Sequence, residues 1–434
     1  MDLETSFPKY DSYQDSGTDW LGEIPSDWSL ESIRSVTQLK SEKNQPNLQV
    51  LSVYREYGVI PKDSRDDNHN ATSLDTSGYK VVGEGDLVVN KMKAWQGSMG
   101  VSEHNGIVSP AYITCRVDAE RVYPKFLHYL LRSQPYIGVY NALSYGVRVG
   151  QWDMHYEDFK HIPLPLPDRT LQQRIANFLD QKTAEIDEAI AKKQHFIELL
   201  KEQKAIVINH AVTKGLNPDV TMRNSGVKRI GEVPAHWSIV RLKHISKKIT
   251  DGEHISPKIV DAGVPLLSAK DVRERKIRFD AAAYVSVPDA KKFRKRCNPE
   301  RGDILIVSRG ATVGRIGLVE DDQEFCLMGS VILVKPKEVV SPGFLYYSLN
   351  QEDVQRSILQ ASDASAQQAV YLVDVKETVV CIPPLGEQQA IYTHLEFQIE
   401  EFDRAVSFQI KEIDLLTEIK TVYISSVVTG KIKI

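Results

Sequence analysis

The feature that most constrains this chain is a long segment without proline or glycine, which runs from Asp168 to Lys214. Its apolar residues recur at alternating steps of three and four residues or their multiples, which is the spacing of a seam between paired helices. The pattern predicts a helix of about 60 Å with Thr170 as its N-cap and Gly215 as its stop. An isolated helix would expose this seam to water, so the helix needs a partner. The seam residues are Ile175, Leu179, Ile186, Ala189, Phe196, Leu200 and Val207, with Lys182, Lys193 and Gln203 between them.

A second copy of this segment supplies the partner. From Ile382 the chain reads Ile-Pro-Pro-Leu-Gly-Glu-Gln-Gln, and after Gly386 it contains no glycine or proline until Gly430. The near-constant offset between the copies marks an internal duplication, so the two helices are expected to pair with each other. Shifted by 216 residues, Pro167 falls on Pro383, Gln172-Gln173 on Gln388-Gln389, Ile175 on Ile391, Leu179 on Leu395, Asp187 on Asp403, and Val212-Thr213 on Val428-Thr429.

Shorter segments in front of each helix recur as well. Each half begins with the turn Gly-Glu-Ile/Val-Pro-x-x-Trp, whose indole is expected to pack against a core. A β-rich run, a glycine-punctuated turn and a short helix with proline at its first position follow in the same order. Residues 41–82 and 249–280 show no resemblance to each other. The recurring pairs are 22–28 and 231–237, 85–90 and 302–308, 93–100 and 310–317, and 123–130 and 341–348.

Length and duplication together define the expected domains. A chain of 434 residues is too long for one typical core, so we expect two α+β domains of about 160 residues, each followed by a long helix. The expected boundaries are 1–165 for the first domain, 166–216 for its helical region, 217–383 for the second domain, and 384–434 for its helical region.

Composition excludes several classes of protein. No stretch approaches the about 20 apolar residues of a membrane span, and residues 1–6 lack the basic and apolar parts of a signal peptide. We therefore expect a cytoplasmic protein that does not contact a membrane. The cysteines form no Cys-x-x-Cys pair, so they are expected to be reduced core thiols rather than disulfide or zinc ligands. They are Cys115, Cys297, Cys326 and Cys381.

Charge is distributed unevenly along the chain. The net charge is −4, yet residues 225–320 hold 20 Lys and Arg against 11 Asp and Glu, whereas residues 384–420 hold 3 against 8. A basic domain beside an acidic helix suggests a polyanion as the partner of one and a protein as the partner of the other. Ordinary fluctuation of local charge would give the same counts.

The sequence offers no convincing catalytic motif. Residues 310–317 are glycine-rich but lack the Lys-Ser/Thr that ends a phosphate-binding loop. Residues 298–301 read Asn-Pro-Glu-Arg, not the Asn-Pro-Pro-aromatic signature of amino-methyltransferases, and no Glu-x-Lys follows Asp303 as in metal-dependent nucleases. No histidine pair has metal-ligand spacing on a helix. We expect neither a catalytic site nor a metal site in this chain.

Candidate binding residues lie in equivalent turns and loops of the two halves. Arg and Lys suit guanine edges and Gln suits adenine edges, while aromatic rings can stack, so these segments could read DNA bases. Ordinary turn chemistry remains an alternative for each residue. The turns carry Lys91, Lys93, Trp95 and Gln96 in the first half and Arg309 and Arg315 in the second, and the loops carry Tyr145, Arg148 and Gln151, and Gln367 and Gln368.

Two further candidates occur only in the second half. His254 lies in an Asp-Gly-Glu-His-Ile-Ser-Pro loop, close to Lys258, where a binding role is expected rather than a chemical one. Residues 291–296 place five cations around Phe293, with Lys292 and Arg294 as candidate phosphate contacts. A solvated surface loop is the alternative for this cluster.

These residues resemble the specificity subunits of type I restriction-modification systems. The resemblance covers nearly the whole chain. It rests on the repeated Gly-Glu-Ile/Val-Pro-x-x-Trp segment, on the proline runs that lead to Gln-Gln, on the two long helices and on the divergent inserts between them. Each motif is weak alone, but their duplicated order is specific.

The resemblance implies a fold and a division of labour. Each globular unit would be a target recognition domain for one half of a split, asymmetric DNA site. The helices would pair antiparallel as a spacer with pseudo-twofold symmetry and would dock two modification subunits. Those subunits would carry S-adenosylmethionine and methylate adenine, and restriction subunits with ATP and Mg²⁺ would supply translocase and nuclease activity. This chain would itself need no cofactor.

Two alternatives remain at this point. The chain could be an autonomous nuclease or methyltransferase with a cryptic site, which turnover by the single chain would reveal. It could also be a coiled-coil scaffold unrelated to DNA, which would show no salt-dependent DNA binding.

Overall fold

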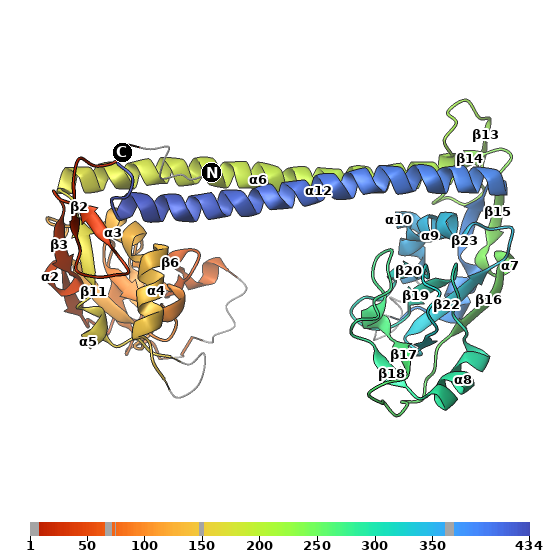
Figure 1. Cartoon of the computed structure of the whole chain (residues 1–434), viewed down its shortest axis with the longest axis horizontal. Helices are drawn as coiled ribbons and strands as arrows, with labels where there is room; N and C mark the ends of the chain where they lie inside the picture. Colours follow the sequence, from red (N-terminus) through yellow and green to blue (C-terminus); the bar gives the residue numbers. More distant parts are fainter. Residues whose placement is uncertain (1–7, 66–71, 74, 147–151, 361–368) are drawn as a thin grey trace. The chain divides into compact units, whose positions relative to one another are not determined.

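A computed structural model describes the chain except for residues 1–7, 66–71, 74, 147–151 and 361–368. The chain divides into two compact units (Figure 1). Unit 1 combines Met1–Gln194 with Ile410–Ile434, and unit 2 is His195–Gln409. Each unit therefore contains the first part of one long helix and the last part of the other.

Helices α6 (Arg169–Lys214) and α12 (Leu385–Val428) are the two long helices that the sequence predicts. Residue numbers rise along one helix as they fall along the other across their ion pairs, so the helices run antiparallel. The pairs are Asp187–Lys420 and Lys193–Glu412 in unit 1 and Lys204–Asp403 in unit 2, with nitrogen to oxygen distances of 2.6–2.7 Å.

The buried face of α6 departs from the predicted seam in its second half. Phe196 is 46% exposed, whereas its neighbour Ile197 is only 8% exposed. Gln203 is likewise exposed, and Lys204 takes the half-buried position beside Asp403. The predicted seam follows a strict seven-residue repeat, but a straight helix turns once in about 3.6 residues, so the inner face moves by one position over several turns.

The two ends of α6 are also only partly as predicted. The helix begins at Arg169, and the Oδ1 atom of Asp168 accepts hydrogen bonds from the backbone N–H groups of Thr170 and Leu171 at 2.9 and 3.0 Å. Asp168 is therefore the capping residue, and the prediction of Thr170 was wrong. A carboxylate also interacts favourably with the positive end of the helix dipole. Gly215 ends the helix as predicted, with a φ of +77°.

The globular part of unit 1 is built around an antiparallel sheet in the order β4-β11-β8-β9. Helices α3 and α4 cover it. The strands of unit 1 are β1 (Tyr13–Asp15), β2 (Glu23–Pro25), β3 (Ser29–Ser32), β4 (Thr37–Lys40), β5 (Leu51–Tyr54), β6 (Gly58–Pro61), β7 (Lys80–Val82), β8 (Leu87–Val89), β9 (Met99–Val101), β10 (Gly106–Val108), β11 (Ile113–Val117) and β12 (Pro163–Leu166). Its helices before α6 are α2 (Ile33–Val36), η1 (Lys62–Ser64), η2 (Ala94–Gln96), α3 (Pro124–Leu131), α4 (Gln134–Leu143) and α5 (Tyr156–Phe159).

Unit 2 repeats this plan with the sheet order β16-β22-β19-β20. A second sheet, β18-β17-β21, has its central strand β17 in the insert at 249–280 and has no three-stranded counterpart among the described residues of unit 1. The strands are β13 (Met222–Asn224), β14 (Glu232–Pro234), β15 (Ser238–Arg241), β16 (Ser246–Asp251), β17 (Val264–Leu267), β18 (Ala283–Val285), β19 (Ile304–Val307), β20 (Ile316–Leu318), β21 (Cys326–Leu327), β22 (Val331–Pro336) and β23 (Val379–Ile382). The helices before α12 are α7 (Leu242–Ile245), η3 (Ala269–Asp271), α8 (Val287–Arg296), α9 (Pro342–Asn350), α10 (Glu352–Gln360) and α11 (Leu372–Glu377).

Each globular part shares one hydrophobic core with the helix ends beside it. In unit 1 the core contains Trp28 with Ile175 and Leu179 of α6 and Val428 of α12. In unit 2 the repeat-related set is Trp237, Ile391, Leu395 and Val212. The duplicated α+β fold on paired long helices is thus confirmed. Among the described residues, no helix combines the length and the apolar character needed to cross a membrane.

A buried glutamine joins each long helix to its globular part. The Oε1 atom of Gln172 accepts a hydrogen bond from the backbone N–H of Tyr123 at 2.8 Å, and its Nε2 donates to the carbonyls of Arg121 and Pro167. Both residues of the repeat-related pair, Gln172 and Gln388, are at most 1% exposed. Gln388 makes the same three kinds of contact, with the N–H of Ser341 and the carbonyls of Val339 and Pro383.

Replacing Gln172 by leucine should therefore destabilise unit 1. The substitution leaves the buried N–H of Tyr123 without an acceptor, which costs about 1–3 kcal/mol. Urea unfolding of the purified chain should show a lower midpoint for Gln172→Leu and little change for Gln173→Leu, because Gln173 is the exposed neighbour. Equal midpoints for the two variants would show that the glutamine does not hold the helix in place.

Candidate nucleic-acid interface

The candidate residues of unit 1 lie where a turn and a loop meet. The turn follows β8 and contains η2, and Gly97 closes it with a φ of +86°. The loop follows α4, and its backbone forms an isolated antiparallel bridge between Tyr145 and Asp153. The two segments are joined by a hydrogen bond from the N–H of Met154 to the carbonyl of Lys91 at 3.0 Å and by an ion pair between Lys91 and Asp153 at 3.1 Å.

Aromatic rings line this junction. Trp95 contacts Trp152 edge to face, with ring centroids 5.3 Å apart, and its buried indole N–H has no acceptor among the described residues. Tyr145 stacks on His155 with centroids 5.0 Å apart and ring planes 19° apart. The structure thus brings Lys91, Trp95 and Tyr145 together, as expected for one contact surface.

The other candidates of unit 1 occupy different positions. Lys93 is exposed and forms no ion pair with a described residue, so its charge is available to a ligand. Gln96 is half-buried in η2. Arg148 and Gln151 lie outside the described residues, and their role stays a prediction.

Unit 2 has the same junction. The N–H of Val370 donates to the carbonyl of Ser308 at 2.9 Å, and these residues are the counterparts of Met154 and Lys91. An isolated antiparallel bridge joins Arg309 to Ala369, and the side chain of Arg309 is exposed. Gln367 and Gln368 lie outside the described residues.

Arg315 differs from the other candidates because it contacts the backbone. Its Nη1 atom donates to the carbonyl of Val272 at 3.3 Å, and Val272 forms an isolated bridge with Ile277. Arg315 therefore holds the turn at 272–277 in place. This contact uses an N–H group of Nη1, and the role of Arg315 in DNA readout stays a prediction.

His254 lies next to the unit 2 junction. Its Nε2 atom is 2.7 Å from Oδ2 of Asp251, and its ring covers Gly329, where an added Cβ would lie 2.5 Å from the ring. The hydroxyl of Ser308 contacts the carbonyl of Gly329, so His254 and Arg309 belong to one neighbourhood. Lys258 is exposed and has no ion pair with a described residue.

The cationic cluster at 291–296 forms the last turns of α8, so the alternative of a surface loop was wrong. Ser286 caps this helix by accepting a hydrogen bond from the N–H of Asp289. Phe293 is buried rather than presented to a ligand. Arg294 is held by Glu324 and Asn298, whereas Lys292 is exposed.

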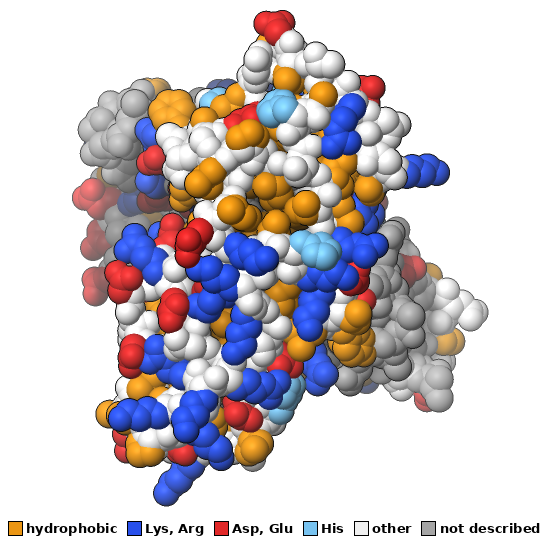
Figure 2. All heavy atoms as spheres, turned by 90° about the vertical axis from the view of Figure 1, so that its right-hand side faces the viewer, with side chains coloured by type: hydrophobic (Ala, Val, Ile, Leu, Met, Phe, Trp, Pro, Cys, Tyr) orange, Lys and Arg blue, Asp and Glu red, His pale blue; other side chains and the backbone are white. Residues whose placement is uncertain are grey.

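Figure 2 shows that Lys and Arg side chains crowd the lower part of one face, on the side where Figure 1 places α7, β16 and α8. In α8, Lys291, Lys292 and Lys295 are exposed without an ion pair to a described residue, while Lys247 of β16 pairs with Glu338 at 3.1 Å. This face can attract a polyanion without the geometry needed to distinguish bases.

Equivalent turns from the divergent inserts were missed by sequence comparison. Residues 54–58 pack over Gly100, and residues 272–277 pack over its counterpart Gly317. Arg132 donates to the carbonyls of Arg55 and Glu56 at 2.7 and 2.9 Å, as Arg315 does to the second turn. The available signal was the pair Arg-Glu, which stands at 55–56 and again at 273–274.

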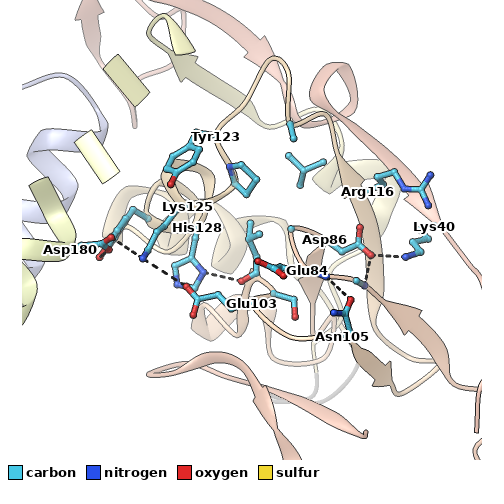
Figure 3. A pocket seen from close by; sticks show the side chains of 18 residues that line it. Lys40, Glu84, Asp86, Glu103, Asn105, Arg116, Tyr123, Lys125, His128 and Asp180 are labelled. Atoms are coloured by element: carbon cyan, nitrogen blue, oxygen red, sulfur yellow. Dashed lines mark hydrogen bonds and ion pairs between the residues drawn. The ribbon is translucent and has the colours of Figure 1, made fainter. Parts of the chain in front are cut away.

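Unit 1 also contains a cavity of about 1020 Å³ away from the junction (Figure 3). Two ion pairs border it, Lys40–Asp86 at 2.7 Å and Lys125–Asp180 at 2.8 Å. In unit 2 the ring of Tyr392 covers Gly343, the counterpart of Lys125. Both buried or half-buried lysines of this cavity are thus already paired with carboxylates. The described residues contain no cluster of His, Cys, Asp and Glu suited to a metal ion.

His128 forms one wall of this cavity and is held neutral by its surroundings. Burial, assisted by the positive charge of Arg132, lowers its pKa to about 4. The Nδ1–H of the neutral ring donates to the carbonyl of Val101 at 3.3 Å, and the ring packs against Gly58 and Gly100. It thereby supports the hairpin of β5 and β6.

The architecture defines the class of protein: a duplicated α+β recognition module carried on two long antiparallel helices, with one turn-and-loop junction per module. Residues 234–414 match the family described as the type I restriction modification DNA specificity domain. The chain is 24% identical to the EcoBI specificity subunit of Escherichia coli, over 74% of this chain and 67% of that one. It is also 24% identical to the putative MjaX specificity subunit of Methanocaldococcus jannaschii, over 95% and 96%.

Solved structures show the same fold. A chain from a study of complex assembly and conformational transition of the type I R-M system aligns with a TM-score of 0.70 at 17% identity, over 93% of this chain and 98% of that one. The HsdS subunit of Thermoanaerobacter tengcongensis aligns with a TM-score of 0.54 at 16% identity, over 94% and 98%. Residues 234–414 thus match a type I restriction modification DNA specificity domain, and nearly the whole chain is similar to specificity subunits of type I restriction-modification systems.

The lowered pKa of His128 predicts how stability depends on pH. Its folded pKa of about 4 lies below the ordinary value of 6.5, so the unfolded chain binds the proton more readily. The stabilisation is complete above pH 6.5 and is lost as the pH falls toward 4, by about 3 kcal/mol at the low-pH limit. Urea midpoints measured from pH 7 to 4 should fall less steeply for His128→Gln than for the wild type.

His210→Gln is the matched control, because His210 is exposed on α6. Its pH profile should follow that of the wild type. A His128→Gln profile as steep as the wild-type profile would show that other groups cause the loss.

Proposed function

We propose that this subunit reads a bipartite, asymmetric DNA sequence, with one half-site for each unit. The observation that carries the proposal is the repeated junction. The same backbone hydrogen bond, from Met154 to Lys91 and from Val370 to Ser308, holds the turn and loop together in both units. The side chains placed on this frame differ, so the two half-sites should differ as well.

The chemistry of each junction suits DNA. In unit 1 it offers the exposed cation Lys93 beside the Trp95–Trp152 aromatic pair. In unit 2 it offers Arg309, whose guanidinium can donate two hydrogen bonds to a guanine edge in the major groove. The exposed lysines of α8 add a phosphate-attracting face to unit 2, which supplies affinity without sequence information.

We further propose that the chemical steps belong to partner subunits. Two modification subunits would bind S-adenosylmethionine and methylate adenine, and restriction subunits would use ATP and Mg²⁺. This chain would hold none of these cofactors and would use the long helices as a spacer between half-sites. An isolated chain that turned over with S-adenosylmethionine or Mg²⁺ would contradict this division.

Exposed apolar residues on the long helices support docking of two such subunits. Leu199 and Ile206 of α6 are seven residues apart, as are their repeat-related counterparts Leu415 and Val422 of α12. All four are 39–56% exposed. Apolar side chains at heptad spacing on a solvent face form a seam for a further helix. One such stripe lies in each unit, so each unit can dock one subunit.

The experiment for DNA readout is methylome sequencing of a host that carries this chain with its modification subunit. The wild type should produce methylation at one discrete bipartite sequence. Arg309→Ala should relax or weaken readout at one half only, by about 5- to 150-fold if the contact is bidentate. The matched control is Arg301→Ala, because Arg301 lies beyond the opposite end of β19 and pairs with Asp322. Equal loss at both halves would contradict the assignment of one half-site to each unit.

The docking stripes predict how the complex loses its partners. Leu415→Glu should release one modification subunit and Leu199→Glu the other, because each places a charge in an apolar seam. Mass measurement of the purified complex should give one modification subunit for each single variant and none for the double variant. Full occupancy in the double variant would place the docking surface elsewhere. Asp414→Lys, which changes a charge at an exposed position about 100° around the helix from Leu415, should leave the stoichiometry unchanged.

A further inference from the structure

We infer that the ring of Tyr145 is a stacking platform for DNA in the half-site read by unit 1. When the base to be methylated leaves the DNA duplex, it opens a gap in the base stack, and the ring of Tyr145 packs against the bases at this gap. The inference rests on the proposed function and names the feature of DNA that this junction takes. It concerns Tyr145 and the ring behind it, His155.

One face of the Tyr145 ring is covered and the other is open. His155 stacks on it with planes only 19° apart and centroids 5.0 Å apart. The residue nevertheless remains 58% exposed. Because a stacked neighbour hides one face, the remaining exposure belongs to the opposite face and the edge, where a third flat ring can continue the stack.

The platform is fixed before any ligand binds. Tyr145 follows the end of α4 by two residues, and its N–H and carbonyl exchange hydrogen bonds with the backbone of Asp153 at 3.2 and 3.0 Å. Asp153 is held in turn by Lys91. A ring that is already oriented loses little conformational freedom on binding, so most of the stacking energy is realised as affinity.

The geometry of the ring selects its target. Paired bases in a duplex present only their edges to a protein, whereas a ring face needs a base face. A base face becomes available where a base has been displaced, and enzymes that act on a base displace it from the duplex. An aromatic side chain that fills the gap offsets part of the lost stacking, as inserted side chains do in kinked DNA.

Unit 2 places a comparable ring at the related position. His155 precedes α5, and its counterpart Tyr371 precedes α11 and is 45% exposed. Both units thus have a ring, His155 or Tyr371, next to the junction of loop and turn. The stacked Tyr145 is described for unit 1, so the test addresses that half-site.

The test is a binding cycle on the assembled methyltransferase complex, with duplexes that carry its methylation site. One duplex is intact, and one has an abasic residue in place of the target adenine of the half-site read by unit 1. Tyr145→Ala should weaken binding to the intact duplex by about 5- to 150-fold, since a base stacked on an aromatic ring contributes about 1–3 kcal/mol. Tyr145→Phe should retain wild-type affinity.

The abasic duplex tests whether the ring of Tyr145 fills the gap that the target base leaves in the base stack. Wild type and Tyr145→Phe should prefer it to the intact duplex, because the unstacking cost has been removed while the ring still fills the gap. In Tyr145→Ala this preference should shrink, and an abasic residue in the other half-site should affect all variants equally. Tyr57→Ala, which removes another exposed tyrosine of unit 1, should behave as the wild type.

Two results separate the possible failures. An unchanged preference for the abasic duplex in Tyr145→Ala, with methylation still bipartite, would overturn the stacking role and leave DNA readout intact. Absence of any discrete bipartite site for the wild-type complex would overturn the proposed function itself.

Discussion

Two buried glutamines hold the recognition modules to the long helices. Gln172 and Gln388 each use the amide oxygen and nitrogen together, so that one side chain fixes the start of a long helix, the preceding strand and the start of a short helix. A hydrophobic contact at the same place would attach the module without setting its rotation. Because an amide must satisfy donor and acceptor directions at once, it admits one orientation.

The duplication separates what the two modules share from what they do not. Shared features are backbone contacts and buried groups, such as the tryptophan at 28 and 237 and the hydrogen bond between turn and loop. The features that differ between the two modules are the exposed side chains attached to this shared backbone. Evolution of a new target can therefore proceed at the surface, because the frame depends on the backbone rather than on the side chains that would read bases.

Much of the fold follows from the sequence, because strong local signals coincide with global ones. The proline before each helix, the glycine after it and the repeated tryptophan each have one favourable structural use. The register of α6 was harder: Phe196 and Ile197 are both apolar, and only the accumulated turn of the helix decides which one faces inward. The helix cap was also hard to predict, because Asp168 and Thr170 are both polar residues that can cap a helix. For residues 291–296, a helix and a loop would be equally solvated, so the sequence did not distinguish them.

The candidate site was less predictable for a different reason. Lys91, Trp95 and Tyr145 could be named as candidates from their residue types and their place in a turn and a loop, but their contacts depend on neighbours distant in sequence. Arg315 is a candidate base reader by residue type, and nothing in the sequence indicates that its side chain contacts the carbonyl of Val272. Trp152 and His155 become relevant only because they contact Trp95 and Tyr145. No local pattern encodes such pairings. The turn and the loop come together because α4, which leads into the loop, packs against η2 of the turn.

The discontinuous make-up of unit 1 affects how the chain is synthesised. Its core includes Tyr423 and Val427, so this unit remains incomplete while unit 2, which is continuous from His195 to Gln409, emerges from the ribosome in full. The usual order of folding, with the N-terminal unit first, is thereby reversed. Until the last part of α12 has been made, the apolar surface that Tyr423 and Val427 cover stays exposed on the first module, and chaperones can bind the nascent chain there.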